Sequence, residues 1–373
     1  MLFAKYGPAA VASFLLQVAA AKPSPEVIAI PNTVINGSTE AEFASSPGSN
    51  LDGHKLIPGP NATSYDWWYF DAVSSTTNES VTIVFFENGP EGFIQPGPAA
   101  LWASVSGSFK NGSFFSYQVP AADKAVITQT SDTISGDWSG SGYSFDGRTR
   151  GNKSEYVVTI NTPAVGVAGT LTLRSKAPPH YPCTLNKPGS SELIIPGVGW
   201  ANVQPDAKAT LSLQVGDAKL AFADGVGYHD KNWGVVPFVS VVQSWYWGHG
   251  RLGPYSVVWF DTLARDGNEY GSAYVAYDGK VIEAGCGTDT LSARPFGKNS
   301  TYPPTPAIGA PQFMALRFDL GDGKMLVANV TTEVVVAAAP IYDRMIGTIR
   351  GGIEGEGKTF EGRTLYEQFK FPL

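Results

Sequence analysis

Three short segments combine aromatic side chains with groups that can transfer a proton. The first is Asp-Trp-Trp-Tyr-Phe-Asp at 66–71, and the second is Gly-Val-Gly-Tyr-His-Asp-Lys-Asn-Trp-Gly at 225–234. The third, at 245–261, contains Trp-Tyr-Trp-Gly-His and then Tyr-Ser-Val-Val-Trp-Phe-Asp. Small-molecule sites are usually apolar pockets with a few convergent polar groups. The three segments therefore predict a site for an apolar molecule beside an acid or a base.

Strand alternation sorts these side chains by face, because successive residues of a strand point to opposite sides. Trp245, Trp247 and His249 share one face, and Tyr246 lies on the other. Downstream, Tyr255, Trp259 and Asp261 share a face. In the first segment, Asp66, Trp68 and Phe70 oppose Trp67, Tyr69 and Asp71. An acid on an inward aromatic face is expected to have a raised pKa, which suits a general acid.

These patterns predict the roles of individual residues. The expected acid–base residues and hydrogen-bond donors are His229, Asp230, Lys231, Tyr246 and Asp261. The residues expected to contact substrate are Trp68, Tyr69, Tyr228, Trp233, Trp245, Trp247, His249, Tyr255 and Trp259. In the alternative interpretation each aromatic residue belongs to the core, and the 228–234 run is a polar turn closed by a packed tryptophan. Elbow, phosphate-loop, dinucleotide and His-Glu-x-x-His motifs are absent from the sequence.

The elements that position these segments are predicted to be strands. β-branched or alternating runs occur at 81–86, 156–160, 170–174, 210–215, 255–260 and 273–277. Asp-Gly pairs at 146, 224, 266, 278 and 322 predict hairpin turns. A loop-rich stretch at 177–199 with five prolines marks the expected domain boundary. We therefore expect an all-β chain of two antiparallel units, covering 22–199 and 200–373.

Composition and targeting signals narrow the functional class. The 373-residue chain is 43% hydrophobic and 16% charged with a net charge of −7, and no basic face suggests a nucleic-acid partner. Residues 1–21 read as a signal peptide, too short for a membrane span; an amphipathic anchor is the alternative. Secretion is supported by seven glycosylation sequons. They lie at Asn36, Asn61, Asn78, Asn111, Asn152, Asn299 and Asn329.

The two cysteines, Cys183 and Cys286, are expected to form one disulfide in an oxidising compartment. No Cys-x-x-Cys or Cys-x-His spacing indicates a metal site, and four histidines do not by themselves support one. We expect neither a metal nor a cofactor. The expected partners are apolar small molecules, and the sequence leaves monomer and homodimer open.

At these segments the chain resembles the lipocalin-like superfamily of carotenoid hydratase (hydroxyneurosporene synthase). The matching motifs are Trp-Trp-Tyr-Phe-Asp at 67–71, Gly-Tyr-His-Asp-Lys-Asn-Trp-Gly at 227–234 and Gly-Arg-Thr-Leu-Tyr-Glu at 362–367, within a resemblance that covers most of residues 60–373. The resemblance implies an N-terminal antiparallel β-sandwich followed by a lipocalin-like β-barrel, with a ligand cavity in or between them. The hydratase members carry His where this chain has Lys231, which argues against carotenoid-type hydration.

The resemblance extends to fungal cofactor-free pericyclases. The signal peptide and sequons are most similar to the secreted hetero-Diels–Alderases of tropolone-sesquiterpenoid pathways. Those enzymes dehydrate a hydroxymethyl precursor to an o-quinone methide and add it to a humulene-type alkene. Holding two partners in reactive geometry supplies much of the rate enhancement that such a reaction needs. Three alternatives remain: a terpenoid hydratase, dehydratase or isomerase, a non-catalytic carrier of an apolar metabolite, and a carbohydrate enzyme using two of Asp66, Asp71 and Asp261.

Overall fold

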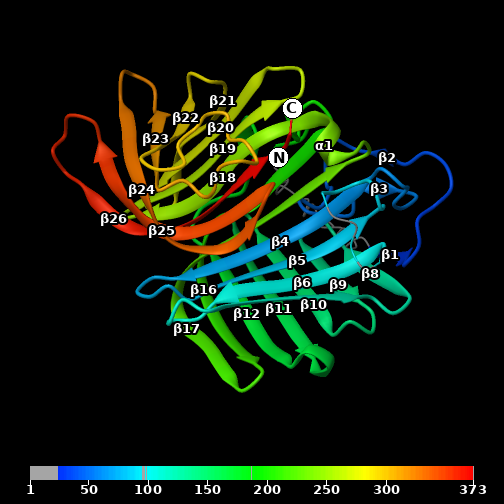
Figure 1. The fold of residues 1–373 in the computed structure, drawn as a ribbon. Helices are drawn as coiled ribbons and strands as arrows, with labels where there is room; N and C mark the ends of the chain where they lie inside the picture. Colours follow the sequence, from blue (N-terminus) through cyan, green and yellow to red (C-terminus); the bar gives the residue numbers. More distant parts are fainter. Residues whose placement is uncertain (1–23, 95–96, 98, 186, 373) are drawn as a thin grey trace, which may run out of the picture.

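The computed structural model describes residues 24–94, 97, 99–185 and 187–372, and these form two large antiparallel sheets (Figure 1). The predicted all-β class is confirmed. The predicted signal peptide, 1–21, lies outside the described residues. Within the described ranges the helical elements are one turn of α-helix, α1 (Phe238–Val241), and one 3-10 turn (Pro163–Val165). No helix in the described part of the chain has the length and apolar character needed to cross a membrane.

The first sheet has fifteen strands and curls around its own core. Trp138 and Trp68 lie on strands that are six places apart in the sheet, and they meet inside it with ring centroids 5.6 Å apart. Along the sheet the strands are β1 (Glu26–Pro31), β8 (Lys124–Gln129), β9 (Thr133–Trp138), β10 (Tyr143–Arg150), β11 (Lys153–Thr162), β12 (Val167–Ser175), β16 (Val198–Val215), β17 (Ala218–Gly234), β4 (Tyr65–Ser74), β5 (Ser80–Asn88), β6 (Leu101–Ser108) and β7 (Phe114–Pro120). Three short strands, β13 (His180–Tyr181), β14 (Thr184–Leu185) and β15 (Leu193–Ile195), flank β16.

The second sheet has nine strands and forms a nearly closed barrel. Its edge strand approaches β19, where the Ala293 N–H donates to Asp261 at 3.1 Å. In order the strands are β21 (Lys280–Cys286), β20 (Glu269–Tyr277), β19 (Tyr255–Ala264), β18 (Val242–Leu252), β26 (Phe360–Lys370), β25 (Tyr342–Ile353), β24 (Met325–Ala339), β23 (Phe313–Asp319) and β22 (Leu291–Phe296). A separate two-stranded pair, β2 (Glu40–Ala41) and β3 (Leu56–Ile57), lies in the N-terminal arm.

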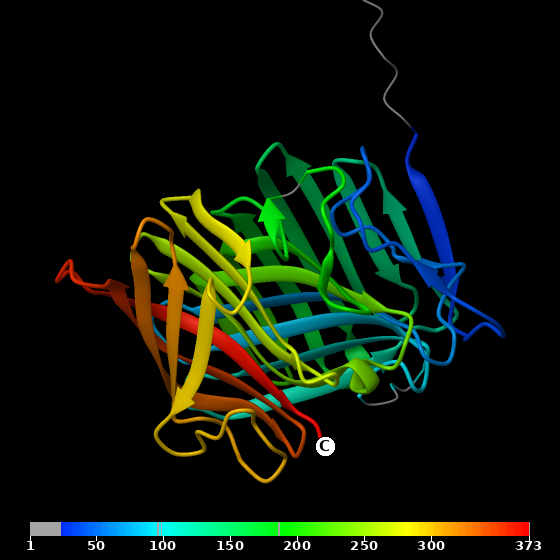
Figure 2. The same cartoon turned by 90° about the horizontal axis from the view of Figure 1, so that it is seen from above.

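The two sheets meet face to face, with β4, β16 and β17 of the first against β18, β19 and β26 of the second (Figures 1 and 2). We expected the second unit to begin at residue 200. The first unit extends to Gly234, because β16 pairs with β12 and β17 pairs with β4, both in the first sheet. The chain passes from the first sheet to the second between Gly234 and Val242. The proline-rich stretch marks a loop along the edge of the first sheet, and composition alone does not say which sheet the next strand joins.

Two of the predicted hairpin turns are wrong. Asp146-Gly147 lies inside β10 and Asp224-Gly225 inside β17. A Cβ on Gly147 would come within 2.2 Å of the Tyr156 ring, so this glycine makes room for an aromatic side chain rather than a turn. The pair at 278 does form a turn, with Asp278 at φ 48°.

The disulfide prediction is confirmed: Cys183 and Cys286 are bonded and connect the edge of the first sheet to β21. The side chains of all seven sequon asparagines are at least partly exposed, as attached glycans would require. Glycosylation itself stays a prediction.

Candidate functional site

The strands β4 and β17 run side by side and present two different surfaces. Tyr69 lies opposite Asp230 and Asp71 opposite Tyr228 in their ladder. The odd-numbered β4 side chains pack toward the second sheet, whereas Trp68 and Phe70 pack into the core of the first sheet. The faces expected from alternation in this segment are confirmed. As a result, the side chains of neighbouring residues in the 228–234 run point to opposite faces of the first sheet.

A small cavity of about 20 Å³ lies where the two sheets meet. Its walls are mostly aromatic, with three polar side chains among them. The lining residues are Trp67, Tyr69, Asp230, Asn232, Trp245, Trp247, Phe260 and Glu367. Phe260, Trp247 and Glu367 are direct neighbours across β19, β18 and β26, and they face Tyr69 and Asp230 of the first sheet. We call this hollow the interface cavity.

Two larger hollows lie elsewhere, at the N-terminal arm (about 730 Å³) and beside β9–β11 (about 790 Å³). The first is lined mainly by the loop between β2 and β3 and by residues 129–131, and the second by Arg148, Arg150 and neighbouring polar side chains. Neither is lined by any residue of the three aromatic segments. We place the site at the interface cavity, because its aromatic walls enclose a buried acid whose pKa is raised, and such groups mark candidate sites.

Asp230 is the acid of the interface cavity. Its Oδ2 atom accepts hydrogen bonds from Trp200 Nε1 and from the Tyr228 hydroxyl, both at 2.8 Å. Burial raises the pKa of Asp230 to about 8, although the two donors act in the opposite direction. The carboxyl is therefore mostly protonated at pH 7. Because Oδ2 is occupied by donors, the proton belongs on Oδ1, for which the described residues supply no donor.

The aromatic walls hold one another in edge-to-face geometry. Trp247 contacts Tyr69 with ring centroids 5.3 Å apart and Tyr228 at 4.9 Å. Trp245 contacts Phe260 at 4.8 Å with an interplanar angle of 82°. Such contacts favour aromatic pairs beyond the area that they bury. The rings of the cavity wall therefore orient one another.

Two further carboxyl groups next to this cavity have basic side chains as partners. His249 Nε2 lies 2.9 Å from Asp71 Oδ1, and its ring stacks on Tyr228 at 4.7 Å. On the other side, Arg344 Nε donates to Glu367 at 2.8 Å. Asp71 and Glu367 are thus each paired with a basic side chain, whereas Asp230 accepts only from the neutral donors Trp200 and Tyr228.

The opposite face of β17 carries a buried polar network rather than a second part of this site. His229 donates through Nδ1 to the Tyr69 carbonyl at 2.8 Å, and its Nε2 lies 3.0 Å from Asp52. Lys231 pairs with Asp66 above the ring of Trp68. Burial lowers the pKa of Lys231 to about 8, against the effect of Asp66, and burial raises that of Asp66.

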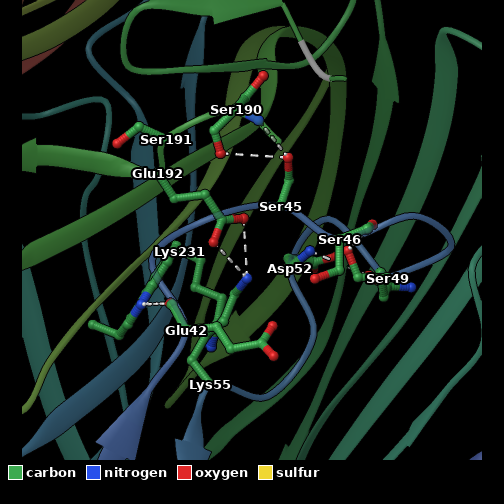
Figure 3. A network of polar contacts seen from close by, with 12 residues as sticks. Glu42, Ser45, Ser46, Ser49, Asp52, Lys55, Ser190, Ser191, Glu192 and Lys231 are labelled. Carbon is green, nitrogen blue, oxygen red and sulfur yellow. Dashed lines mark hydrogen bonds and ion pairs between the residues drawn. The ribbon is translucent and has the colours of Figure 1, made fainter. Parts of the chain in front are cut away.

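The network continues into the N-terminal arm (Figure 3). Lys55 reaches the carboxylate of Glu192 at 3.0 Å, in the same region as Asp52 and Lys231. Trp233 packs in the same core and donates through Nε1 to the carbonyl of Glu42 at 2.8 Å. These contacts hold the N-terminal arm against the inner face of the first sheet.

The remaining predicted residues lie inside the second barrel. Tyr246, Tyr255 and Trp259 belong to its core. Asp261 accepts from Arg294 at 2.5 Å and from the Tyr302 hydroxyl at 2.9 Å. Burial raises the pKa of Asp261 to about 6, and Arg294 opposes this shift. The expectation of an acid with a raised pKa is met, but this acid faces away from the interface cavity.

Comparison with known proteins places this arrangement in a family. Residues 28–293 match a family described as Diels-Alderase-like. The chain belongs to the Diels-Alderase-like family. It is 44% identical to the quinolone epoxide rearrangement protein asqO of Emericella nidulans, over 96% of this chain and 97% of asqO. It is 42% identical to the quinolone epoxide rearrangement protein penF of Penicillium thymicola, over 93% and 96% of the two chains.

The fold has a solved counterpart in CghA with Sch210972, with a TM-score of 0.74 at 15% identity, covering 92% of this chain and 98% of CghA. These similarities support an enzyme with a pericyclase or cyclase role in secondary metabolism. The specific tropolone-sesquiterpenoid branch expected from the sequence is not among these relatives, two of which carry quinolone epoxides in their names.

In this Diels-Alderase-like protein all three aromatic segments contribute to the interface cavity, but only some of their predicted residues lie there. Six predicted residues meet between the sheets: Tyr69, Tyr228, Asp230, Trp245, Trp247 and His249. Four lie inside the first sheet: Trp68, His229, Lys231 and Trp233. Four lie inside the second barrel: Tyr246, Tyr255, Trp259 and Asp261. The two sets inside the sheets correct our expectation of one shared chamber, because β-alternation sends adjacent residues of one strand to different compartments.

Sequence reasoning missed Trp67, Asn232, Phe260 and Glu367 as lining residues. Trp67 and Asn232 lie on the same strand faces as Tyr69 and Asp230, so alternation could have found them once Tyr69 and Asp230 were placed. Phe260 and Glu367 lie on the strands at either side of Trp247, and only the pairing of β18 with β19 and β26 shows this. Within the described residues, no group of three or more His, Cys, Asp or Glu side chains could hold a metal ion.

Proposed function

We propose that this protein rearranges an epoxide on an apolar aromatic substrate of the quinolone class by general-acid catalysis. The observation that carries the proposal is the Asp230 carboxyl, which is 4% exposed, lies in an aromatic cavity and has its pKa raised by burial to about 8. The names of the relatives asqO and penF supply the substrate class.

The proposed reaction uses the Asp230 carboxyl as an acid and the aromatic rings of the cavity wall as stabilisers of positive charge. The Oδ1–H of Asp230 protonates the epoxide oxygen, and the C–O bond breaks with its electron pair moving to that oxygen. Positive charge then develops on the neighbouring carbon. The Trp247 and Tyr69 rings stabilise it, because aromatic faces attract cations in a desolvated site. A nucleophile or π-bond within the same molecule captures the cation and loses a proton, which returns to Asp230. Substrate and product are isomers, so no co-reactant is needed.

The cavity walls also restrict which product forms. An apolar cavity excludes bulk water, which would otherwise capture the cation and give a diol. The cavity of about 20 Å³ is smaller than the ~300–1,000 Å³ typical of ligand pockets, so binding must displace side chains of the lining.

The direct test is incubation of the pure protein with a quinolone epoxide and no cofactor. Wild type is expected to form a single isomer, and Asp230→Asn to lose about 10²–10⁴-fold in kcat. Asparagine keeps the shape and the acceptor for Trp200 and Tyr228 but has no acidic proton. Circular dichroism in the near ultraviolet checks that the variant is folded. Full activity of the folded variant would refute the proposal.

The second candidate is the hetero-Diels–Alder reaction expected from the sequence. The same neutral carboxyl favours it, because an acid assists loss of water from a hydroxymethyl precursor to give an o-quinone methide. Family membership supports it. The two reactions differ in mass balance: the rearrangement gives an isomer of one substrate, whereas the cycloaddition gives an adduct of two substrates minus water.

We further infer that the chain is secreted and glycosylated. The partly exposed sequons and the Cys183–Cys286 bond support passage through an oxidising compartment. Intact mass of protein collected from culture medium, before and after treatment with a glycosidase that removes N-linked glycans, tests this. An unchanged mass, or retention of the protein inside the cell, would contradict it.

A further inference from the structure

Several buried polar atoms next to the interface cavity have no hydrogen-bond partner among the described residues. They are Trp245 Nε1, Trp247 Nε1, Tyr69 Oη and His249 Nδ1. The first three belong to side chains that line the cavity. Native structures rarely leave buried donors unpaired, because each such group loses its bonds to water on folding and gains nothing in return. An ordered water or a ligand is the expected partner.

The indole N–H groups set the kind of acceptor that the cavity needs. A cavity of about 20 Å³ has room for about one water. A water molecule has two lone pairs and therefore accepts from two donors at most. The two indole N–H groups, which can only donate, would use both lone pairs, whereas the Tyr69 hydroxyl can donate or accept. A ligand that takes the place of this water must therefore offer the indoles an oxygen with two lone pairs.

The two indoles are the most informative of these donors. Trp245 and Trp247 are two residues apart on β18, so both N–H groups come from the same face of one strand. An indole nitrogen donates and cannot accept, which excludes an ammonium group as its partner. The Phe260 ring stands edge-on to Trp245 with centroids 4.8 Å apart, and the Tyr228 ring stands edge-on to Trp247 at 4.9 Å, so both indoles are held in fixed orientations.

We propose that the Trp245 and Trp247 N–H groups bind the carbonyl oxygen of the substrate, so that the cavity selects aromatic lactams and related planar conjugated carbonyl compounds. This inference rests on the proposed function, which assigns the Asp230 proton to the epoxide oxygen and leaves the indoles for the carbonyl. One carbonyl oxygen has two lone pairs and can accept from both indoles. The indoles then orient the ring, and with it the epoxide, relative to Asp230.

The test measures binding with two probes that carry no epoxide, quinolin-2(1H)-one and quinoline-2(1H)-thione. They have almost the same shape, but sulfur is the weaker acceptor. Titration calorimetry is expected to show that wild type prefers the lactam by about tenfold or more. Replacing Trp247 or Trp245 with 3-benzothienylalanine keeps the ring and removes the N–H. Each replacement is expected to reduce the preference, and the double replacement to abolish it.

The matched control is Trp102, which belongs to the same apolar cluster but does not line the cavity. Its N–H already donates to Asn88 Oδ1 at 2.7 Å. The same replacement at Trp102 should leave the lactam preference unchanged. An undiminished preference in the Trp245 and Trp247 double variant would overturn the inference and leave only ordered water as the partner of these donors.

The two proposals fail separately. Lactam preference is read from binding alone, and turnover from the Asp230→Asn variant. If that variant keeps full turnover while the indole replacements abolish lactam preference, the acid role is wrong and carbonyl recognition stands. If turnover is lost but the preference is unaffected by the indoles, the acid role stands and carbonyl recognition is wrong.

Discussion

The hydrogen bond from Tyr228 to Asp230 gives a specific prediction, because deleting the hydroxyl oxygen of Tyr228 removes it. Tyr228→Phe keeps the ring between Trp247 and His249 and deletes only the hydroxyl that donates to Oδ2 at 2.8 Å. Burial raises the pKa of Asp230 to about 8, and the donors Trp200 and Tyr228 lower it from what burial alone would give. Loss of one donor should therefore raise it further.

The size of the shift follows from how differently the two forms of the acid use the bond. A hydrogen bond is worth about 1.5–3 kcal/mol when one group is charged and about 0.5–1.5 kcal/mol when both are neutral. The difference of about 1–1.5 kcal/mol corresponds to about one pKa unit. Since the protonated acid is the active form, wild-type activity should be constant at lower pH and fall above about pH 8. In Tyr228→Phe this fall should move to about pH 9.

The assay is kcat/KM for the epoxide over pH 5–10, with infrared titration of the neutral carboxyl stretch as a readout independent of turnover. Tyr246→Phe is the control, since the Tyr246 hydroxyl lies in the core of the second barrel and makes no bond to Asp230. The reasoning is refuted if activity rises with pH through this range. It is equally refuted if the midpoint in Tyr228→Phe stays in place or moves down.

Four further predictions concern the acids and the covalent and ionic links. Burial raises the pKa of Asp230 to about 8 from an ordinary value near 4, so between these pH values the folded state keeps a proton that the unfolded state releases. The free energy of unfolding of wild type should therefore fall by ~5 kcal/mol relative to Asp230→Asn from pH 4 to 8, as measured by urea titration at several pH values. Asp261→Asn, on the far side of the second sheet, should leave kcat and its pH profile unchanged; a loss like that of Asp230→Asn would move the acid to the barrel. Cys183→Ser should lower the free energy of unfolding by about 4–5 kcal/mol for a separation of 103 residues, and reduced wild type should match it in the same titration. Lys231→Met should cost about 3–5 kcal/mol by leaving Asp66 buried without its partner, and adding Asp66→Leu should recover most of this; no recovery would show that the pair itself is essential.

The local parts of the site were predictable from the sequence. Alternation correctly separated Tyr69 from Trp68, and Trp247 from Tyr246, because the two-residue period of a strand is set by backbone geometry alone. Cysteine count sufficed for the disulfide, since two cysteines in an oxidising compartment allow a single pairing. The all-β class followed from the strand patterns in the same way.

Only the tertiary structure decided which faces meet. Asp230 and Asp261 are both buried acids near tryptophans, and nothing within their segments distinguishes the one that lines the interface cavity from the one that faces the barrel core. The answer depends on β17 pairing with β4 rather than with the second sheet, a long-range contact. Strand alternation is local and shows that two residues differ in environment, whereas sheet pairing across more than a hundred residues determines what each environment is.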